Sequence, residues 1–137
     1  MWFTREQFEI CNELKTWGLV PRCEPGDVVV RGFADLGFEE FQVLPGGKLL
    51  SLTAGTITTL PPEHTQHLFW LPSIDEVTEI LERKGVMCLS SRRHDQREWV
   101  VEAQYDAALE AHRSESLHTA LLLVLRAVYK RAFKDSQ

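Results

Sequence analysis

The segment Phe69-Trp70-Leu71-Pro72-Ser73-Ile74-Asp75-Glu76-Val77 decides how the second half of the chain is interpreted. Ser73 is a favourable helix N-cap residue, and Glu76 stands at the position that completes a capping box. Acidic residues follow the cap and basic residues precede Gly85, which is the order that the helix dipole favours. Gly85 suits the left-handed position that ends a helix. The sequence therefore predicts an amphipathic helix between Ser73 and Gly85.

The chain beyond this helix predicts a hairpin and a long apolar helix. Residues 86–89 and 98–103 are expected to be strands, and the polar segment 90–97 is expected to form the hairpin tip. Residues 105–113 are expected to be a loop containing a helical turn. Ser114 or Ser116 caps the last helix, whose apolar stripe is spaced at three and four residues: Leu117, Leu121, Val124, Leu125 and Val128.

The first half of the chain predicts one helix followed by strands. Thr4 and Gln7 form a capping box, and Gly18 ends the helix that begins there. Strands are expected around residues 28–30, 38–43 and 49–52, with a Pro-Gly-Gly turn at residues 45–47. Residues 53–66 are rich in Thr, Pro and Gly, so they are expected to be a long loop or an internal linker.

These elements predict an α+β fold in the order α-β-β-β-α-β-β-α. A mainly antiparallel sheet covered by helices is the architecture that fits this order. Residues 1–137 are interpreted as a single domain, with a possible subdivision near residues 53–66.

Composition restricts the classes of function. The formal net charge is −5, so non-specific binding to nucleic acid is not favoured, although a local basic patch is compatible with it. The sequence has neither an apolar run long enough to span a membrane nor a secretory signal, which predicts a cytoplasmic protein without membrane contact. Its three cysteines have no zinc-site spacing and are expected to be reduced thiols, with a Cys11–Cys23 disulfide as the alternative.

One local basic cluster stands in the predicted hairpin tip. It consists of Arg92, Arg93, His94 and Arg97. At a tip these side chains would contact phosphate or an acidic protein surface. The alternative is a solvated turn, kept polar because the strands on either side are apolar. The cluster lacks interleaved aromatic residues, so a base-stacking surface is not indicated.

Other candidate chemistry has weaker support. His64 and His67 are weak candidates for metal ligands, because they follow Pro61-Pro62 in a predicted loop and no third ligand is specified nearby. Neither the Ser90, Ser91, His94, Asp95 group nor the Asp106, Glu110, His112 group has the pattern of a known catalytic site. The glycine-rich nucleotide-binding motifs are absent. We therefore expect no cofactor and no catalytic residue.

The large apolar side chains raise the question of self-association. Trp70 and Trp99 are expected in the core of the second half. Leu122 and Leu123 extend the apolar surface of the last helix beyond one stripe, and Trp2 and Phe3 precede the first cap. A symmetric homodimer would bury this surplus, whereas the alternative is that three helices on one sheet already absorb it.

The chain resembles a known group of proteins from Trp70-Leu71-Pro72-Ser73 onward. This sequence leads into an acidic amphipathic helix, then a hairpin containing Trp99, then Ser116-Leu117 before Ala120-Leu121-Leu122. The pattern resembles small, uncharacterised phage and prophage proteins, some of which are similar to the phage ABA sandwich domain. The resemblance covers residues 68–132. It implies an accessory cytoplasmic protein of a mobile element and carries over no catalytic or binding residue.

Three functional hypotheses follow. The first is a non-enzymatic phage- or prophage-type accessory protein that binds another protein, whose identity the sequence does not specify. The second is a nucleic-acid-contacting factor that uses the tip from Arg92 to Arg97. The third is a small metal-dependent enzyme that uses His64 and His67.

Overall fold

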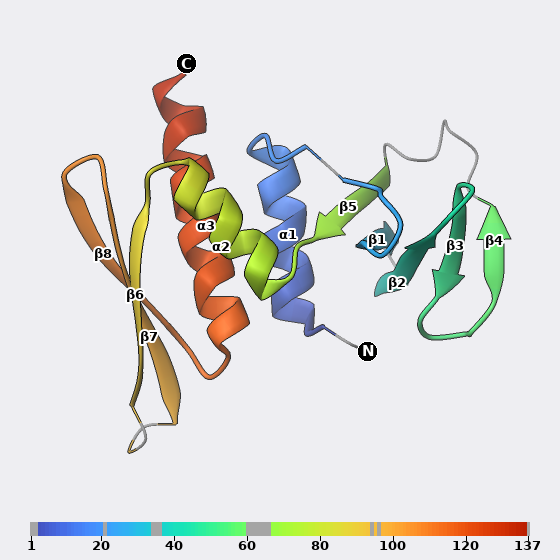
Figure 1. The fold of residues 1–137 in the computed structure, drawn as a ribbon, viewed down its shortest axis with the longest axis horizontal. Helices are drawn as coiled ribbons and strands as arrows, with labels where there is room; N and C mark the ends of the chain where they lie inside the picture. The colour runs from blue at the N-terminus through green and yellow to red at the C-terminus, as the bar shows by residue number, and fades with distance from the viewer. Residues whose placement is uncertain are drawn as a thin grey trace. The chain divides into compact units, whose positions relative to one another are not determined.

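The chain forms two compact units. We describe a computed structural model of the 137-residue chain, in which residues 3–20, 22–33, 37–59, 67–93, 95 and 97–136 are described. Unit 1 is Met1–Leu71 and unit 2 is Pro72–Gln137. Figure 1 shows the elements of each unit along the chain. The expected subdivision near residues 53–66 falls partly outside the described residues, since 60–66 are not among them.

Unit 1 begins with the helix that the Thr4–Gln7 capping box predicts. Helix α1 spans Arg5–Thr16. The Gln7 backbone N–H donates to Thr4 Oγ1 (3.2 Å), and the Thr4 backbone N–H donates to Gln7 Oε1 (2.9 Å). Phe8, Ile10, Cys11 and Leu14 form its buried face. The helix lies against strand β5, and the Phe8 ring packs 5.2 Å from the ring of Phe38 on β2, measured between centroids.

Five antiparallel strands form the sheet of unit 1. They are β1 (Val28–Phe33), β2 (Gly37–Leu44), β3 (Lys48–Ser51), β4 (Ile57–Thr59) and β5 (Leu68–Leu71), in the order β4-β3-β2-β1-β5. The turn between β2 and β3 contains Gly46 and Gly47, both at positive φ (82° and 75°), as the sequence predicts. Val29, Phe41, Val43, Leu49 and Leu68 form a buried cluster in this sheet.

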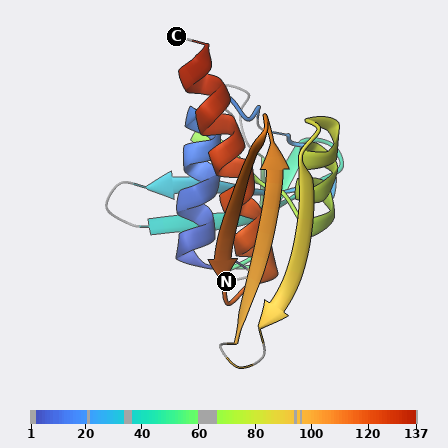
Figure 2. The same ribbon diagram turned by 90° about the vertical axis from the view of Figure 1, so that its left-hand side faces the viewer.

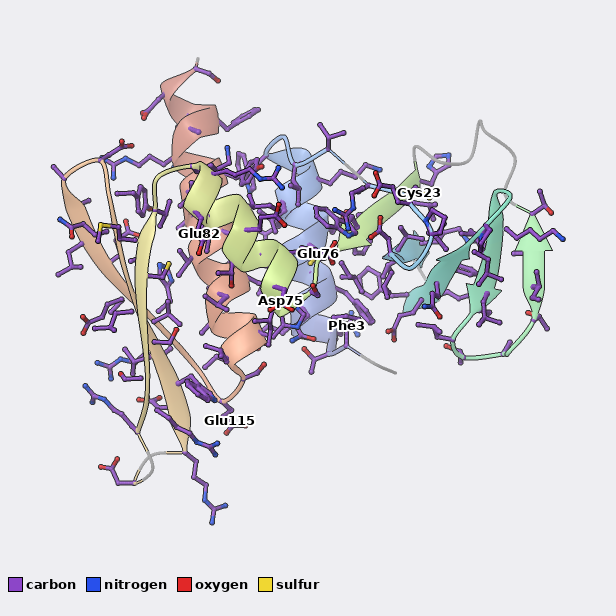
Figure 3. The ribbon with its side chains drawn as sticks, in the orientation of Figure 1. Phe3, Cys23, Asp75, Glu76, Glu82 and Glu115 are labelled. Carbon is purple, nitrogen blue, oxygen red and sulfur yellow. The ribbon has the colours of Figure 1, made fainter. Side chains whose placement is uncertain are left out.

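Unit 2 begins with the helix predicted after Pro72. Helix α2 spans Ile74–Arg83, and both bonds of its capping box are present: Glu76 N–H to Ser73 Oγ (3.2 Å) and Ser73 N–H to Glu76 Oε1 (2.9 Å). Figure 3 labels Asp75 and Glu76 in the first turn of this helix and Glu82 near its other end. Gly85 has a φ of 74°, which turns the chain out of the helix.

Three antiparallel strands and the last helix complete unit 2. The strands are β6 (Met87–Arg93), β7 (Glu98–Tyr105) and β8 (Ala108–Ser114), in the order β6-β7-β8. Helix α3 spans Leu117–Asp135 with Ser116 as its N-cap, and it packs on β7, β8 and α2. Figure 2 shows the three strands lying across one side of α3.

The α+β class and the predicted order of helices and strand groups are confirmed, and the finer prediction needs three corrections. Residues 105–113 were predicted as a loop with a helical turn, but they contain the β7–β8 turn and most of β8. The strands belong to two separate sheets, and β4 and β5 join the three strands expected between the first two helices. Trp70 is buried in β5 of unit 1 rather than in the second half, whereas Trp99 is half-buried in unit 2.

The apolar surplus that suggested a homodimer is largely buried within the chain. Leu122 is 1% exposed and Leu123 is half-buried, while Phe3 is also half-buried. Trp2 lies outside the described residues. The side chains of α3 therefore give little reason for a dimer, and self-association stays a prediction. Among the described helices, none combines the length and the apolar character that a bilayer crossing requires.

Replacing Ser73 by alanine removes the hydroxyl that accepts the Glu76 N–H at the start of α2. We expect the free energy of unfolding to fall by about 1 kcal/mol, the usual effect of losing an N-cap. Urea unfolding followed by circular dichroism measures this change. Ser90→Ala, at an exposed strand position, is the control and should change stability by less than about 0.5 kcal/mol. An unaltered midpoint for Ser73→Ala would contradict the role of the cap.

Asp106 and Ala107 form the two-residue turn between β7 and β8, and both have positive φ (50° and 61°). Asp tolerates this conformation, but Ala does so only with strain. Ala107→Gly should therefore raise the free energy of unfolding by about 1 kcal/mol. Ala111→Gly, in the regular strand β8, is the matched control and should lower it by about 0.5–1 kcal/mol. Equal destabilisation by both glycines would contradict the turn.

Candidate functional site

Two residues of the predicted basic cluster, Arg92 and Arg93, lie on opposite faces of a hairpin. Arg92 and Arg93 end β6 and are exposed, Arg97 lies in the turn with a φ of 51°, and His94 lies outside the described residues. Because successive strand residues point to opposite faces, Arg92 and Arg93 project apart. The Arg92 guanidinium carbon lies 5.8 Å from the centre of the Trp99 ring, directly across the strand pair. Arg92 and Arg93 therefore do not form one patch.

The predicted histidine pair receives no further ligand in the described part of the chain. His64 is outside it, and His67 is exposed immediately before β5. The described residues contain no group of three or more His, Cys, Asp or Glu side chains placed to hold a metal ion. Of the two histidines, the structure therefore describes only His67, and this single side chain does not define a metal centre.

The three cysteines are free thiols without activation. Cys11 is buried, whereas Cys23 and Cys88 are exposed. Burial raises the pKa of the Cys11 thiol to about 12. Partial burial raises the pKa of Cys88, and partial burial together with the charge of Asp27 raises the pKa of Cys23. A catalytic cysteine needs a lowered pKa, so these thiols do not fit that role.

An ion pair between the half-exposed Arg22 and the buried Asp27 is structural in unit 1. Arg22 donates to both carboxylate oxygens of Asp27, at 3.0 Å from Nε and 2.7 Å from Nη2, and the Glu24 backbone N–H donates to the same carboxylate. Burial acts to raise the pKa of Asp27, but these bonds and the Arg22 charge outweigh it and leave the pKa lowered. The Arg22 guanidinium also lies 4.8 Å from the Trp70 ring centre. The pair fixes the turn before β1.

The outer face of the sheet in unit 2 carries exposed apolar side chains. Met87, Leu89 and Leu109 are 72%, 67% and 71% exposed. Met87 stands opposite Gln104, which stands opposite Leu109, so this row crosses all three strands. Val101 and Ala103 on the other face of β7 are fully buried, and α3 packs on β7 and β8. The exposed row therefore lies on the face turned away from α3.

Strand β6 is an open edge exposed along its full length. All seven of its residues are exposed, and its pairing with β7 is continuous from Met87 to Arg93. In a hairpin with a two-residue turn, the two residues that flank the turn form backbone hydrogen bonds with each other. Tyr105 flanks the turn here, so every second residue of β7 directs its backbone N–H and C=O groups toward β8: Tyr105, Ala103, Val101 and Trp99. The alternate residues of β7 then bond to β6. It follows that the backbone groups of Cys88, Ser90 and Arg92 point away from the sheet.

A set of hydrogen-bonded polar side chains lies on the inner face of β7 and β8. The Tyr105 hydroxyl donates to Glu110 Oε2 at 3.0 Å, and His112 Nε2 lies 3.3 Å from the same oxygen. Burial first, and then the neighbouring Glu110 carboxylate, raise the pKa of Tyr105 against the opposing effect of Arg131. Tyr105 is therefore a neutral hydrogen-bond donor. The sequence analysis named Glu110 and His112 but missed their contact with Tyr105, because it placed residues 105–113 in a loop.

Comparisons of the chain with protein-family models, curated proteins and solved structures find no significant match. The functional argument consequently depends on the residues themselves. Of the features above, the β6 edge combines exposed backbone groups with exposed apolar and basic side chains, and it is the best candidate for a binding surface.

Glu110→Gln tests the polar group on β7 and β8. Removing the carboxylate charge takes away one cause of the raised pKa, so the pKa of Tyr105 should fall toward the ordinary tyrosine value of about 10. Titration of phenolate absorbance, which records both tyrosines of the chain, measures the shift. Glu102→Gln, exposed on the opposite face of β7, is the control. Identical titration curves for the two variants would show that Tyr105 and Glu110 do not interact.

Proposed function

We propose that this chain is a non-enzymatic, phage- or prophage-type accessory protein that acts in the cytoplasm by binding another protein. The observation that carries the proposal is strand β6, an edge strand whose seven residues are all exposed. The phage-type assignment is supported by the sequence resemblance over residues 68–132, which includes this strand.

The backbone of β6 suits strand addition. An open edge presents unpaired N–H and C=O groups, and an extended segment of another protein can bond to them. Natural edges are commonly blocked by proline, a bulge or a covering element. β6 has no proline, and its pairing with β7 runs without a bulge. The outward groups of Cys88, Ser90 and Arg92 would supply the bonds to the incoming strand.

The side chains of β6 indicate the kind of partner segment. Met87 and Leu89 lie on one face, where apolar side chains of an added strand would shield them. Arg92 and Arg93 stand at the other end of the strand and favour acidic residues in the partner. The expected partner is therefore an extended protein segment that is apolar at one end and acidic at the other.

The nucleic-acid alternative has weaker support from the same geometry. Phosphate binding benefits from cations gathered on one surface. Arg92 and Arg93 project to opposite faces, and Arg92 lies over the Trp99 ring. Glu98, which pairs with Arg93 across the strands, also lies 3.6 Å from Arg113. This mixed distribution of charge favours a protein partner.

Selection from a random peptide library tests the proposal. Immobilised wild-type protein should enrich extended peptides that combine apolar and acidic residues. Ser90→Pro removes an N–H that points away from β7, so it should leave the hairpin intact while blocking strand addition. Binding of the enriched peptides to Ser90→Pro should fall at least about tenfold.

Ser90→Ala is the matched control, since it keeps the backbone N–H and should bind as the wild type does. Circular dichroism and thermal unfolding establish that both variants are folded. Equal binding of the peptides to Ser90→Pro and Ser90→Ala would contradict strand addition at this edge, and so would the absence of any enrichment by the wild type.

A further inference from the structure

A hollow of about 220 Å³ lies within unit 2. Three segments distant in the sequence form it. Lys84 and Val86 come from the end of α2 and the turn after it, Tyr105 and Asp106 come from the β7–β8 turn, and the third wall comes from α3. Figure 1 shows the end of α2 and the β7–β8 turn at the same end of this unit.

The α3 wall consists of Val128, Arg131 and Ala132. Spacings of three and four residues place these side chains on one face of the helix. With Val86 opposite, the hollow has an apolar lining of two valines and an alanine. The rest of the lining consists of the cations of Lys84 and Arg131, the Asp106 carboxylate and the Tyr105 side chain. Such a combination of apolar wall and few polar groups is typical of small-molecule sites.

Both cations lie over aromatic rings. The Arg131 guanidinium carbon lies 5.6 Å from the Tyr105 ring centre, and Lys84 Nζ lies 4.4 Å from the Tyr129 ring centre. A guanidinium stacked on a ring keeps N–H donors at its edge, and these match the two oxygens of a carboxylate. Within the described part of the chain, neither Lys84 nor Arg131 forms an ion pair.

Volume and charge restrict the ligand. Pockets for drug-sized molecules have volumes of about 300–1,000 Å³, so 220 Å³ suits a smaller molecule and is too little for a nucleotide. Lys84 and Arg131 contribute two positive charges and Asp106 contributes one negative charge, which leaves one net positive charge in the lining. This balance matches a ligand with a single negative charge better than a doubly charged phosphate.

We infer that the hollow binds a small organic monocarboxylate with a short apolar body. The carboxylate lies against Arg131 and Lys84, and the apolar body lies against Val86, Val128 and Ala132. None of the residues that line the hollow belongs to β6, so its test is independent of the proposed protein-binding function.

Amide NMR titration with isobutyrate tests the inference. Saturable shifts are expected at the backbone amides of Val86, Asp106 and Ala132, with binding in the millimolar range. Arg131→Gln should weaken binding about tenfold or more, because it removes charge-assisted hydrogen bonds. Lys134→Gln, an exposed lysine of the same helix outside the hollow, is the control and should bind as the wild type does.

Lys84→Gln provides a second variant at an exposed position, should Arg131→Gln fail to fold. It should also weaken isobutyrate binding. Inorganic phosphate, titrated in parallel, should bind more weakly than isobutyrate. The inference is overturned by the absence of saturable shifts, by stronger binding of phosphate, or by variants at Arg131 and Lys84 that bind isobutyrate as well as Lys134→Gln does.

Discussion

Unit 2 depends on the packing of a single helix against one face of a three-stranded sheet. Val101 and Ala103 of β7 have no exposed surface, and neither do Val124 and Leu125 of α3. Burying a valine or leucine side chain contributes roughly 1.5–3 kcal/mol, so the buried side chains of this layer stabilise the unit substantially. The alternation of β7 sets which side chains face the helix. The same alternation places Met87, Leu89 and Leu109 of the neighbouring strands on the opposite face.

The dimensions of a helix explain why β6 is exposed. An α-helix with its side chains is about 10–12 Å wide, and neighbouring strands lie about 4.8 Å apart, so one helix covers about two strands. Helix α3 packs on β7 and β8, whereas α2 packs on α3. The third strand, β6, is left with both faces and one edge exposed. The candidate binding surface is thus a geometric result of pairing three strands with one covering helix.

The sequence predicted the elements that carry local signals and missed those that depend on distant contacts. Thr4, Ser73 and Ser116 mark helix starts because capping is a local hydrogen-bonding pattern. Strand β8 was missed because its turn, Asp106-Ala107, lacks the glycine or asparagine that usually announces a two-residue hairpin. Strand β5 is buried on both faces, so its sequence lacks the alternation of apolar and polar residues that indicates a strand.

The sequence also identified the basic residues of the hairpin tip. The division of Arg92 and Arg93 between two faces follows only from the pairing register of β6 with β7. The hollow could not be foreseen, because its three walls meet only in the folded unit.

The open edge of β6 also affects the colloidal behaviour of the protein. Edge strands that are exposed and partly apolar can join to those of other molecules and grow into larger aggregates. Arg92 and Arg93 act as gatekeepers against a parallel alignment of this strand in two copies, since that alignment brings guanidinium groups near each other. This repulsion varies with ionic strength, because about 1 M salt shortens the screening length to roughly 3 Å. Concentrated salt therefore weakens this repulsion between copies of the edge.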